Sequence, residues 1–217
     1  MRDQPITVAI PLFSRFTALD AIGPYEVLQR IPRIDISFVG HEKTEVRTEN
    51  RMLGVTVDAT FEELAEPQLI VFPGGVGTRA LEKDERVLSW LRHAHETTLL
   101  TTSVCTGSIV LGAAGLLSGL TATTHWSCYK ELEAHGAKAV PDRVVEHLDA
   151  RIITSAGVSS GIDMALRIVE LLVDSTAAEA AQLMIEYDPQ PPFDSGALGK
   201  ASQSAVERVI EYAQSRD

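Results

Sequence analysis

The sequence is poor in cysteine, in basic residues and in long apolar runs, and each of these shortages excludes a class of protein. Only two of the 217 residues are cysteine, which excludes a small fold held together by several disulfides. Nineteen Lys and Arg stand against 30 Asp and Glu, and the formal charge of −11 repels nucleic acid and anionic membrane surfaces. No apolar run is long enough to span a bilayer, and the first residues lack the basic region and cleavage site of a signal peptide. We therefore expect a cytoplasmic protein with no nucleic-acid or membrane partner.

What the sequence does have is an alternation of short apolar runs and helical segments. Several runs are apolar on both faces, which is typical of parallel strands covered by helices on both sides. The runs predict strands at Ile6–Phe13, Ile34–Gly40, Gln68–Gly75, Thr97–Val104, Leu120–His125 and Ala150–Gly157. Helical spacing predicts helices at Ala80–Glu96, Thr106–Leu117, Ser127–His135, Gly161–Val173, Thr176–Tyr187 and Ser202–Gln214. The predicted fold class is a doubly wound α/β sandwich with a mostly parallel sheet.

Two segments interrupt this alternation. Glu45–Asp58 carries turn-forming residues between two candidate strands and predicts a hairpin. Tyr187–Gly199 contains three prolines and shows no periodicity, so it must be extended or irregular. We find no internal repeat or low-complexity tract, and we expect a single domain over residues 1–217.

Cys105 lies at the junction of a predicted strand and a predicted helix. The apolar strand ends at Val104, and the small residues Thr106 and Gly107 lead into the helix, as in a nucleophile elbow at the carboxyl edge of a sheet. A helix N-terminus favours thiolate over thiol, so we expect Cys105 to be nucleophilic at neutral pH. The alternative is a buried cysteine that acts as a small hydrophobe, which is the role we expect for Cys128. The surroundings of the two thiols differ, and we predict that they are unrelated.

A glycine-rich loop follows the third predicted strand. Gly74 and Gly75 allow a sharp turn, and their N–H groups, with that of Thr106, could form an oxyanion hole. A plain strand-to-helix loop explains the same glycines and is the simpler interpretation. The segment matches neither a dinucleotide fingerprint nor a phosphate loop, so no nucleotide cofactor is expected.

Three further residues are weaker candidates for the site. Asp20 follows the first strand and either caps the helix that we expect to start at Gly23–Pro24 or projects into the crevice beside Cys105. His125 follows a predicted strand and is either catalytic or structural, and Val158 is a candidate pocket residue. The spacing of the histidines supports no metal site.

Together these segments resemble the ThiJ/PfpI superfamily, and within it the isocyanide hydratases. The resemblance rests on LDAIGPYEVL, FPGGVG, VCTGSIVLGAAGLLSG, TATTHW and EYDPQPPFDSG, and it extends from the first strand to about Gly196. It implies one class I glutamine amidotransferase-like domain, a flavodoxin-like sandwich, a homodimer and no cofactor. In this resemblance Cys105 matches the nucleophile, Asp20 the acid/base, Thr106 the residue after the nucleophile and Gly75 the donor in the glycine loop.

The reaction that the resemblance implies is the addition of water to a small-molecule substrate, an organic isocyanide. The product is an N-substituted formamide, and the intermediate is a covalent cysteine thioimidate. Thr106 stands where peptidase-like members have a histidine, which argues against a Cys-His protease, and few residues follow Gly196 to form a DNA-binding domain. Two alternatives stay open: a cysteine-based oxidative stress sensor or binding protein, and another enzyme of the superfamily such as a glyoxalase-like hydratase or an amidase.

Overall fold

The computed structural model describes residues 5–214, and its internal contacts divide the chain into two compact units, Met1–Ile185 and Glu186–Asp217. The first unit is built on a seven-stranded sheet with the order β10-β11-β7-β6-β1-β2-β5. These strands are β1 (Ile6–Pro11), β2 (Ile34–Gly40), β5 (Ala59–Thr60), β6 (Leu69–Phe72), β7 (Leu100–Val104), β10 (Val144–His147) and β11 (Ile152–Ser155). All neighbours pair in parallel except β10 and β11. The predicted mostly parallel sheet is confirmed.

The order of the strands determines where a crevice forms. The parallel part has the order β5-β2-β1-β6-β7-β11, and its strands from β2 to β11 follow the flavodoxin-like order. The chain leaves β1 toward β2 on one side and later returns to β6 on the other side. Loops that follow β1 and β6 therefore diverge at the carboxyl ends of these strands, where sheets of this kind bind their ligands.

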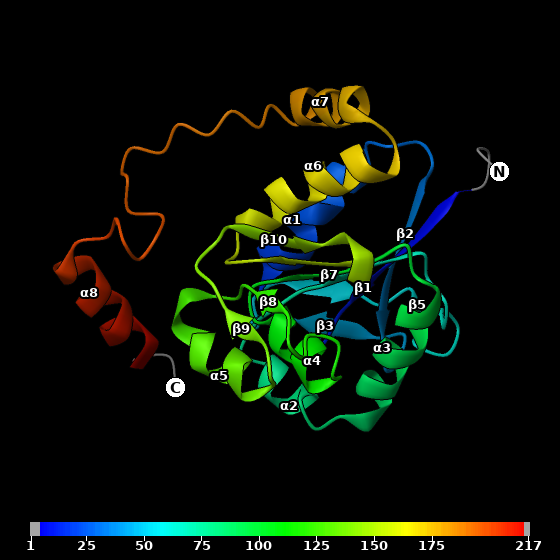
Figure 1. Cartoon of the computed structure of the whole chain (residues 1–217), viewed down its shortest axis with the longest axis horizontal. Helices are drawn as coiled ribbons and strands as arrows, with labels where there is room; N and C mark the ends of the chain where they lie inside the picture. Colours follow the sequence, from blue (N-terminus) through cyan, green and yellow to red (C-terminus); the bar gives the residue numbers. More distant parts are fainter. Residues whose placement is uncertain (1–4, 215–217) are drawn as a thin grey trace. The chain divides into compact units, whose positions relative to one another are not determined.

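Helices cover both faces of this sheet (Figure 1). One face carries α1 (Ala18–Leu28), α6 (Ser160–Leu172) and α7 (Ser175–Met184), and the other carries α2 (Thr78–Leu81), α3 (Glu85–Thr97), α4 (Gly107–Ala113) and α5 (Tyr129–Ala134). The central strands β6 and β7 are buried at every residue, as the apolar runs predicted. The doubly wound sandwich is therefore confirmed. Among residues 5–214, no helix is long and apolar enough to span a membrane.

Two predicted elements differ from the structure, and an edge strand of the main sheet was not predicted. The predicted helix Ala80–Glu96 is divided into α2 and α3, because Asp84 accepts hydrogen bonds from two backbone N–H groups and starts a new helix. The predicted strand Leu120–His125 is short, since β8 (Thr121–Ala122) pairs only with β9 (Lys138–Ala139) in a separate two-stranded sheet. The antiparallel edge strand β10 was not predicted, because it lacks a strong apolar run.

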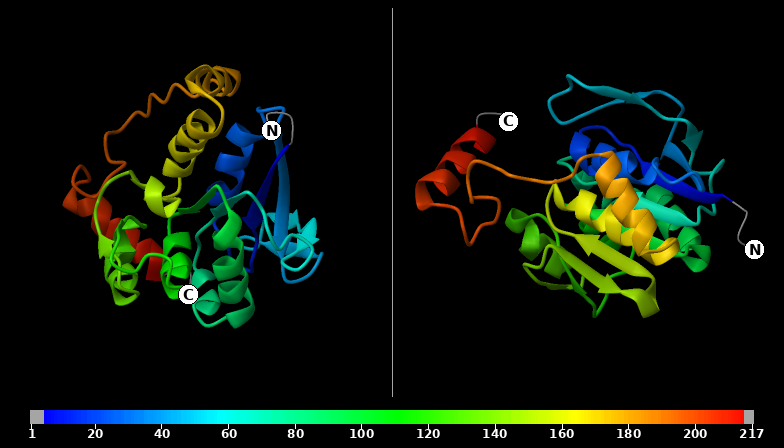
Figure 2. Two further views of the ribbon diagram at one scale, coloured as in Figure 1. Left: turned by 45° about the vertical axis from the view of Figure 1, so that its right-hand side comes forward. Right: turned by 90° about the horizontal axis from the view of Figure 1, so that it is seen from above.

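The predicted hairpin is confirmed, as β3 (Glu45–Arg47) pairs with β4 (Gly54–Thr56) in an antiparallel register. Figure 2 shows this hairpin, in light blue, projecting from the layered body of the first unit. The second unit consists of an irregular proline-rich segment and α8 (Gln203–Gln214), as predicted for both. The expectation of one domain over residues 1–217 stays a prediction.

Candidate active site

A cavity of about 240 Å³ lies at the carboxyl ends of the central strands and includes Cys105 in its wall. Four other predicted site residues line the same cavity: Gly75, Thr106, His125 and Val158. They come from the loops after β6 and β7, from the segment before the 3₁₀ helix η1 (Trp126–Cys128), and from the loop between β11 and α6. The fold therefore brings together residues that are far apart in the sequence.

Cys105 occupies a strained turn between β7 and α4. Its φ of 56° is unusual for a residue other than glycine, and such backbone strain costs on the order of 1–3 kcal/mol. Hydrogen bonds hold this conformation: the Cys105 N–H donates to the Ser155 carbonyl (3.0 Å), and the Cys105 carbonyl accepts from the hydroxyls of Thr124 and Ser108 (both 3.0 Å). The strand-to-helix turn predicted at this position is present, and only 5% of the cysteine is exposed.

Asp20 is fully buried in the first turn of α1. The helix begins at Ala18 with Thr17 as its N-cap, so Asp20 is not the cap, and the predicted start at Gly23–Pro24 is wrong. Its Oδ2 accepts a hydrogen bond from the Gly74 N–H (2.9 Å), which ties the first turn of α1 to the glycine loop. Its Oδ1 is buried and accepts no hydrogen bond of ordinary geometry from the described residues.

The glycine loop is packed too closely for a side chain. A Cβ on Gly74 would lie 2.6 Å from the Thr106 nitrogen and 2.9 Å from Asp20 Oδ2. Gly75 has a φ of 135°, and its N–H donates to Thr106 Oγ1 (2.9 Å). The N–H groups of both glycines are thus donated within the protein, to Asp20 and to Thr106. Their role in an oxyanion hole stays a prediction.

Burial controls the electrostatics of Asp20 and Cys105. Desolvation raises the pKa of Asp20 to about 7, against opposing contributions from the Gly74 N–H and the Cys105 thiol. Desolvation also raises the pKa of Cys105 well above its ordinary value, and the negative charge of Asp20 adds to this effect. Hydrogen bonds from the backbone N–H groups of Thr106 and Val158 lower the pKa of the thiol, but desolvation has the larger effect.

The prediction that the helix terminus makes Cys105 a thiolate at neutral pH is therefore wrong for the resting protein. The two acids are coupled, since ionisation of either one disfavours ionisation of the other. At neutral pH the pair retains at least one proton. Such a pair can pass a proton between the sulfur and the carboxylate during a reaction.

The cavity is also lined by six residues that were not predicted to lie there: Thr17, Glu49, Val76, Arg79, Ser127 and Cys128. Cys128 ends η1 and lies in the same cavity wall as Cys105. Both thiols are free, so the prediction that they are unrelated and form no disulfide is confirmed, although they share a cavity. Arg79 forms an ion pair with Glu131 (3.2 Å) at the cavity rim. No sequence signal identified these residues, because their placement depends on how the loops fold over the sheet.

Among residues 5–214, no group of three His, Cys, Asp or Glu side chains is arranged to hold a metal ion. The cavity wall offers two thiols, a carboxyl group, a guanidinium group, an imidazole and backbone N–H groups.

Comparison with known proteins places this site in a family. A model of the DJ-1/PfpI family matches residues 6–171. The chain belongs to the DJ-1/PfpI family. A curated member, the isonitrile hydratase of Pseudomonas putida, is 40% identical to this chain over 208 residues, which are 96% of this chain and 90% of that protein. The resemblance predicted from the motifs is confirmed.

Solved structures of DJ-1/PfpI proteins share the fold. A ThiJ/PfpI family protein from Pseudomonas syringae is 35% identical, with a TM-score of 0.91 over 97% of this chain and 87% of that one. DJ-1beta from Drosophila melanogaster is 22% identical, with a TM-score of 0.76 over 84% of this chain and 98% of that one. The second similarity supports the flavodoxin-like fold alone.

Proposed function

We propose that this DJ-1/PfpI enzyme is an isocyanide hydratase, a hydro-lyase that adds water to an organic isocyanide and releases an N-substituted formamide. The observation that carries the proposal is the buried Asp20–Cys105 pair, which holds a proton at neutral pH beside a cavity that opens to small molecules. The 40% identity with an isonitrile hydratase over nearly the whole chain supports the same reaction.

In the first step the Asp20 carboxylate takes the proton of the Cys105 thiol as the sulfur attacks the isocyanide carbon. Asp20 then gives this proton to the same carbon, which yields a thioimidate, R–N=CH–S–Cys105. Because the pKa of Asp20 is about 7, its carboxyl group can accept and donate a proton near neutral pH. The N–H groups of Thr106 and Val158 stabilise the sulfur while it carries negative charge.

In the second step Asp20 acts as a base toward water. The carboxylate takes a proton from water, hydroxide adds to the thioimidate carbon, and the proton is returned to nitrogen. The resulting R–NH–CH(OH)–S–Cys105 loses its hydroxyl proton, the C–S bond breaks, and the sulfur takes up a proton. One isocyanide and one water thus give one formamide, and the thiol is regenerated with no cofactor.

The cavity limits the substrate to a small molecule. At about 240 Å³ it has room for the isocyanide group and a modest R group but not for a peptide. The charged side chains of Glu49 and Arg79 make part of its wall polar.

The raised pKa of Cys105 favours the hydratase over an oxidative sensor that uses the same thiol. Peroxide oxidises the thiolate form of cysteine, and a thiol with a high pKa that is only 5% exposed reacts slowly. In the hydratase, by contrast, Asp20 is the base that takes the thiol proton as the sulfur attacks.

We also propose, from the family resemblance, that the protein works as a homodimer in the cytoplasm, without nucleic acid. The acidic composition, with a formal charge of −11, supports the last point.

The experiment that tests the function is a panel assay of the purified protein, without added metal, against small alkyl isocyanides and 2-oxoaldehydes. We expect formamide from the isocyanides and little turnover of the 2-oxoaldehydes. Turnover of the 2-oxoaldehydes alone would assign the protein to the glyoxalase-like hydratases instead.

A further inference from the structure

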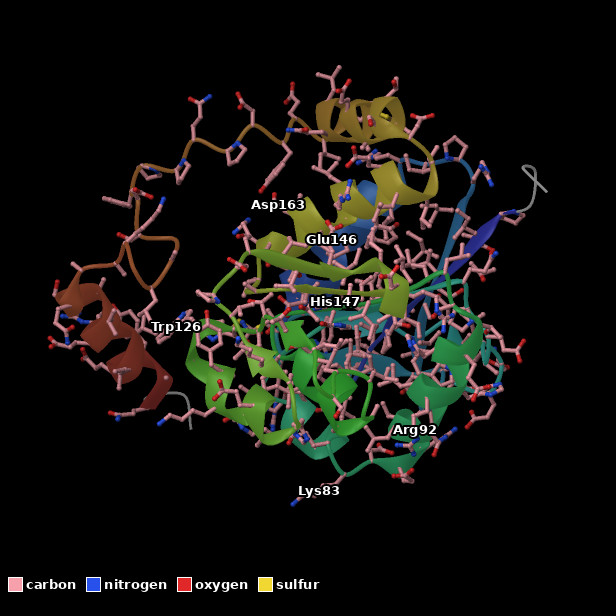
Figure 3. All side chains as sticks on the ribbon, in the orientation of Figure 1. Lys83, Arg92, Trp126, Glu146, His147 and Asp163 are labelled. Atoms are coloured by element: carbon pink, nitrogen blue, oxygen red, sulfur yellow. The ribbon has the colours of Figure 1, made fainter. Side chains whose placement is uncertain are left out.

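His125 is held in the cavity wall through one of its two ring nitrogens. Its Nδ1 lies 3.4 Å from the backbone nitrogen of Ser127 and 2.7 Å from the Ser127 hydroxyl oxygen. The Ser127 N–H donates to Nδ1, and on this contact we assign the ring proton to Nε2. Through this bond the side chain caps η1, which begins at Trp126, labelled in Figure 3.

The position of the ring proton follows from this geometry. Burial lowers the pKa of His125, so the ring is neutral at neutral pH even though the charge of Glu49 opposes the effect. A neutral imidazole whose Nδ1 accepts carries its proton on Nε2. Within the part of the chain that the structure describes, no residue accepts a hydrogen bond from this Nε2. His125 therefore brings an unused donor, and not a base, to the cavity that contains Cys105.

The proposed reaction needs such a donor at one atom. When hydroxide adds to the thioimidate carbon, the electron pair of the C=N bond moves onto nitrogen, and a hydrogen-bond donor there stabilises the developing charge. The N–H groups of Gly74 and Gly75 do not provide it, because they are donated to Asp20 and to Thr106.

We infer that His125 donates a hydrogen bond from Nε2–H to the nitrogen of the thioimidate and thereby accelerates the addition of water, the second step of the reaction. This inference rests on the proposed function. His125 keeps its own proton throughout, and the proton that nitrogen takes up is the one that Asp20 removed from water. His125 is in this sense a catalytic residue of the second step and takes no part in the first.

Two substitutions separate the donor from the helix cap. His125→Asn keeps an acceptor where Nδ1 lies, and asparagine is a good N-cap, but the side chain is too short to replace Nε2–H. His125→Gln places an amide N–H₂ about where Nε2 lies but gives up the cap. A structural role predicts that the glutamine variant is impaired and the asparagine variant is normal. The donor role predicts the reverse.

The readout is formamide production together with the intact mass of the protein after rapid mixing with isocyanide and acid quenching. In His125→Asn we expect turnover to fall by roughly 100- to 1,000-fold, the usual effect of removing such a donor. We also expect the protein to gain the mass of one isocyanide on Cys105, because water addition has become slow. In His125→Gln we expect turnover within about 10-fold of wild type.

Each outcome decides the matter. Normal turnover of His125→Asn, or reduced turnover without a covalent adduct, overturns the inference. Thermal melts of both variants show whether either has lost its fold. Failure of the proposed function looks different: the wild-type protein then forms neither formamide nor an adduct with any isocyanide.

Discussion

Replacing Asp20 with Asn should inactivate the enzyme and stabilise the fold at the same time. Burial raises the pKa of Asp20 from 3.8 to about 7, so the folded protein binds this proton more tightly than the unfolded chain does. The contribution of Asp20 to stability therefore falls as the pH rises from about 4 to about 7, and the full loss is present above pH 7. At about 1.4 kcal/mol per pKa unit, the loss is on the order of 4 kcal/mol.

Asparagine avoids this loss because it is neutral at every pH, and its Oδ1 can still accept the hydrogen bond from the Gly74 N–H. Between pH 5 and pH 8, the stability of Asp20→Asn relative to wild type should rise by roughly 2–3 kcal/mol. The same variant should lose two to four orders of magnitude in turnover, since it cannot exchange a proton.

The assay is urea unfolding of both proteins at pH 5 and at pH 8, with initial rates of formamide formation measured in parallel. Glu26→Gln is the matched control, because Glu26 lies on the same helix but is only half-buried and pairs with Arg30 (2.9 Å). It should change neither activity nor the pH dependence of stability by much. A fully active Asp20→Asn enzyme would show that Asp20 is not the proton carrier. A stability difference that does not change with pH would show that the buried charge of Asp20 does not destabilise the fold.

Two further predictions concern the glycine loop and the assembly. Gly74→Ala should abolish most turnover, because the new Cβ would lie 2.6 Å from the Thr106 nitrogen and 2.9 Å from Asp20 Oδ2. Initial rates and a thermal melt test this prediction. Normal activity would show that the loop can shift to accept the new side chain. Light scattering at micromolar concentration should give the mass of two chains of 23.5 kDa, and a monomer would contradict the proposed homodimer.

The fold and the main features of the site could be predicted from the sequence because they depend on local patterns. Apolar runs that alternate with helical segments determine a doubly wound sandwich, and small residues after Val104 determine the turn at Cys105. Since β1, β6 and β7 are neighbouring parallel strands, residues that follow them meet at one edge of the sheet.

Properties that depend on how deeply a residue is buried and on how the loops pack could not be predicted from local sequence patterns. A helix N-terminus favours a thiolate, but burial outweighs this effect at Cys105, and burial cannot be inferred from the residues around the turn. Cys128 enters the cavity because η1 directs it there, whereas its sequence context is typical of an ordinary helix. The start of α1 was placed too late because Pro24 is tolerated inside the helix, which leaves the Asp20 carbonyl without its usual intrahelical donor.

The central claim is that Cys105 forms a covalent intermediate with an isocyanide. A single-turnover measurement tests it directly: wild-type protein, Cys105→Ser and Cys128→Ala are each mixed with one small isocyanide, and formamide and intact protein mass are followed together. We expect wild type and Cys128→Ala to form formamide through a transient adduct that peptide mapping assigns to Cys105. We expect Cys105→Ser to form neither. Formamide produced by Cys105→Ser at a substantial fraction of the wild-type rate would contradict the account.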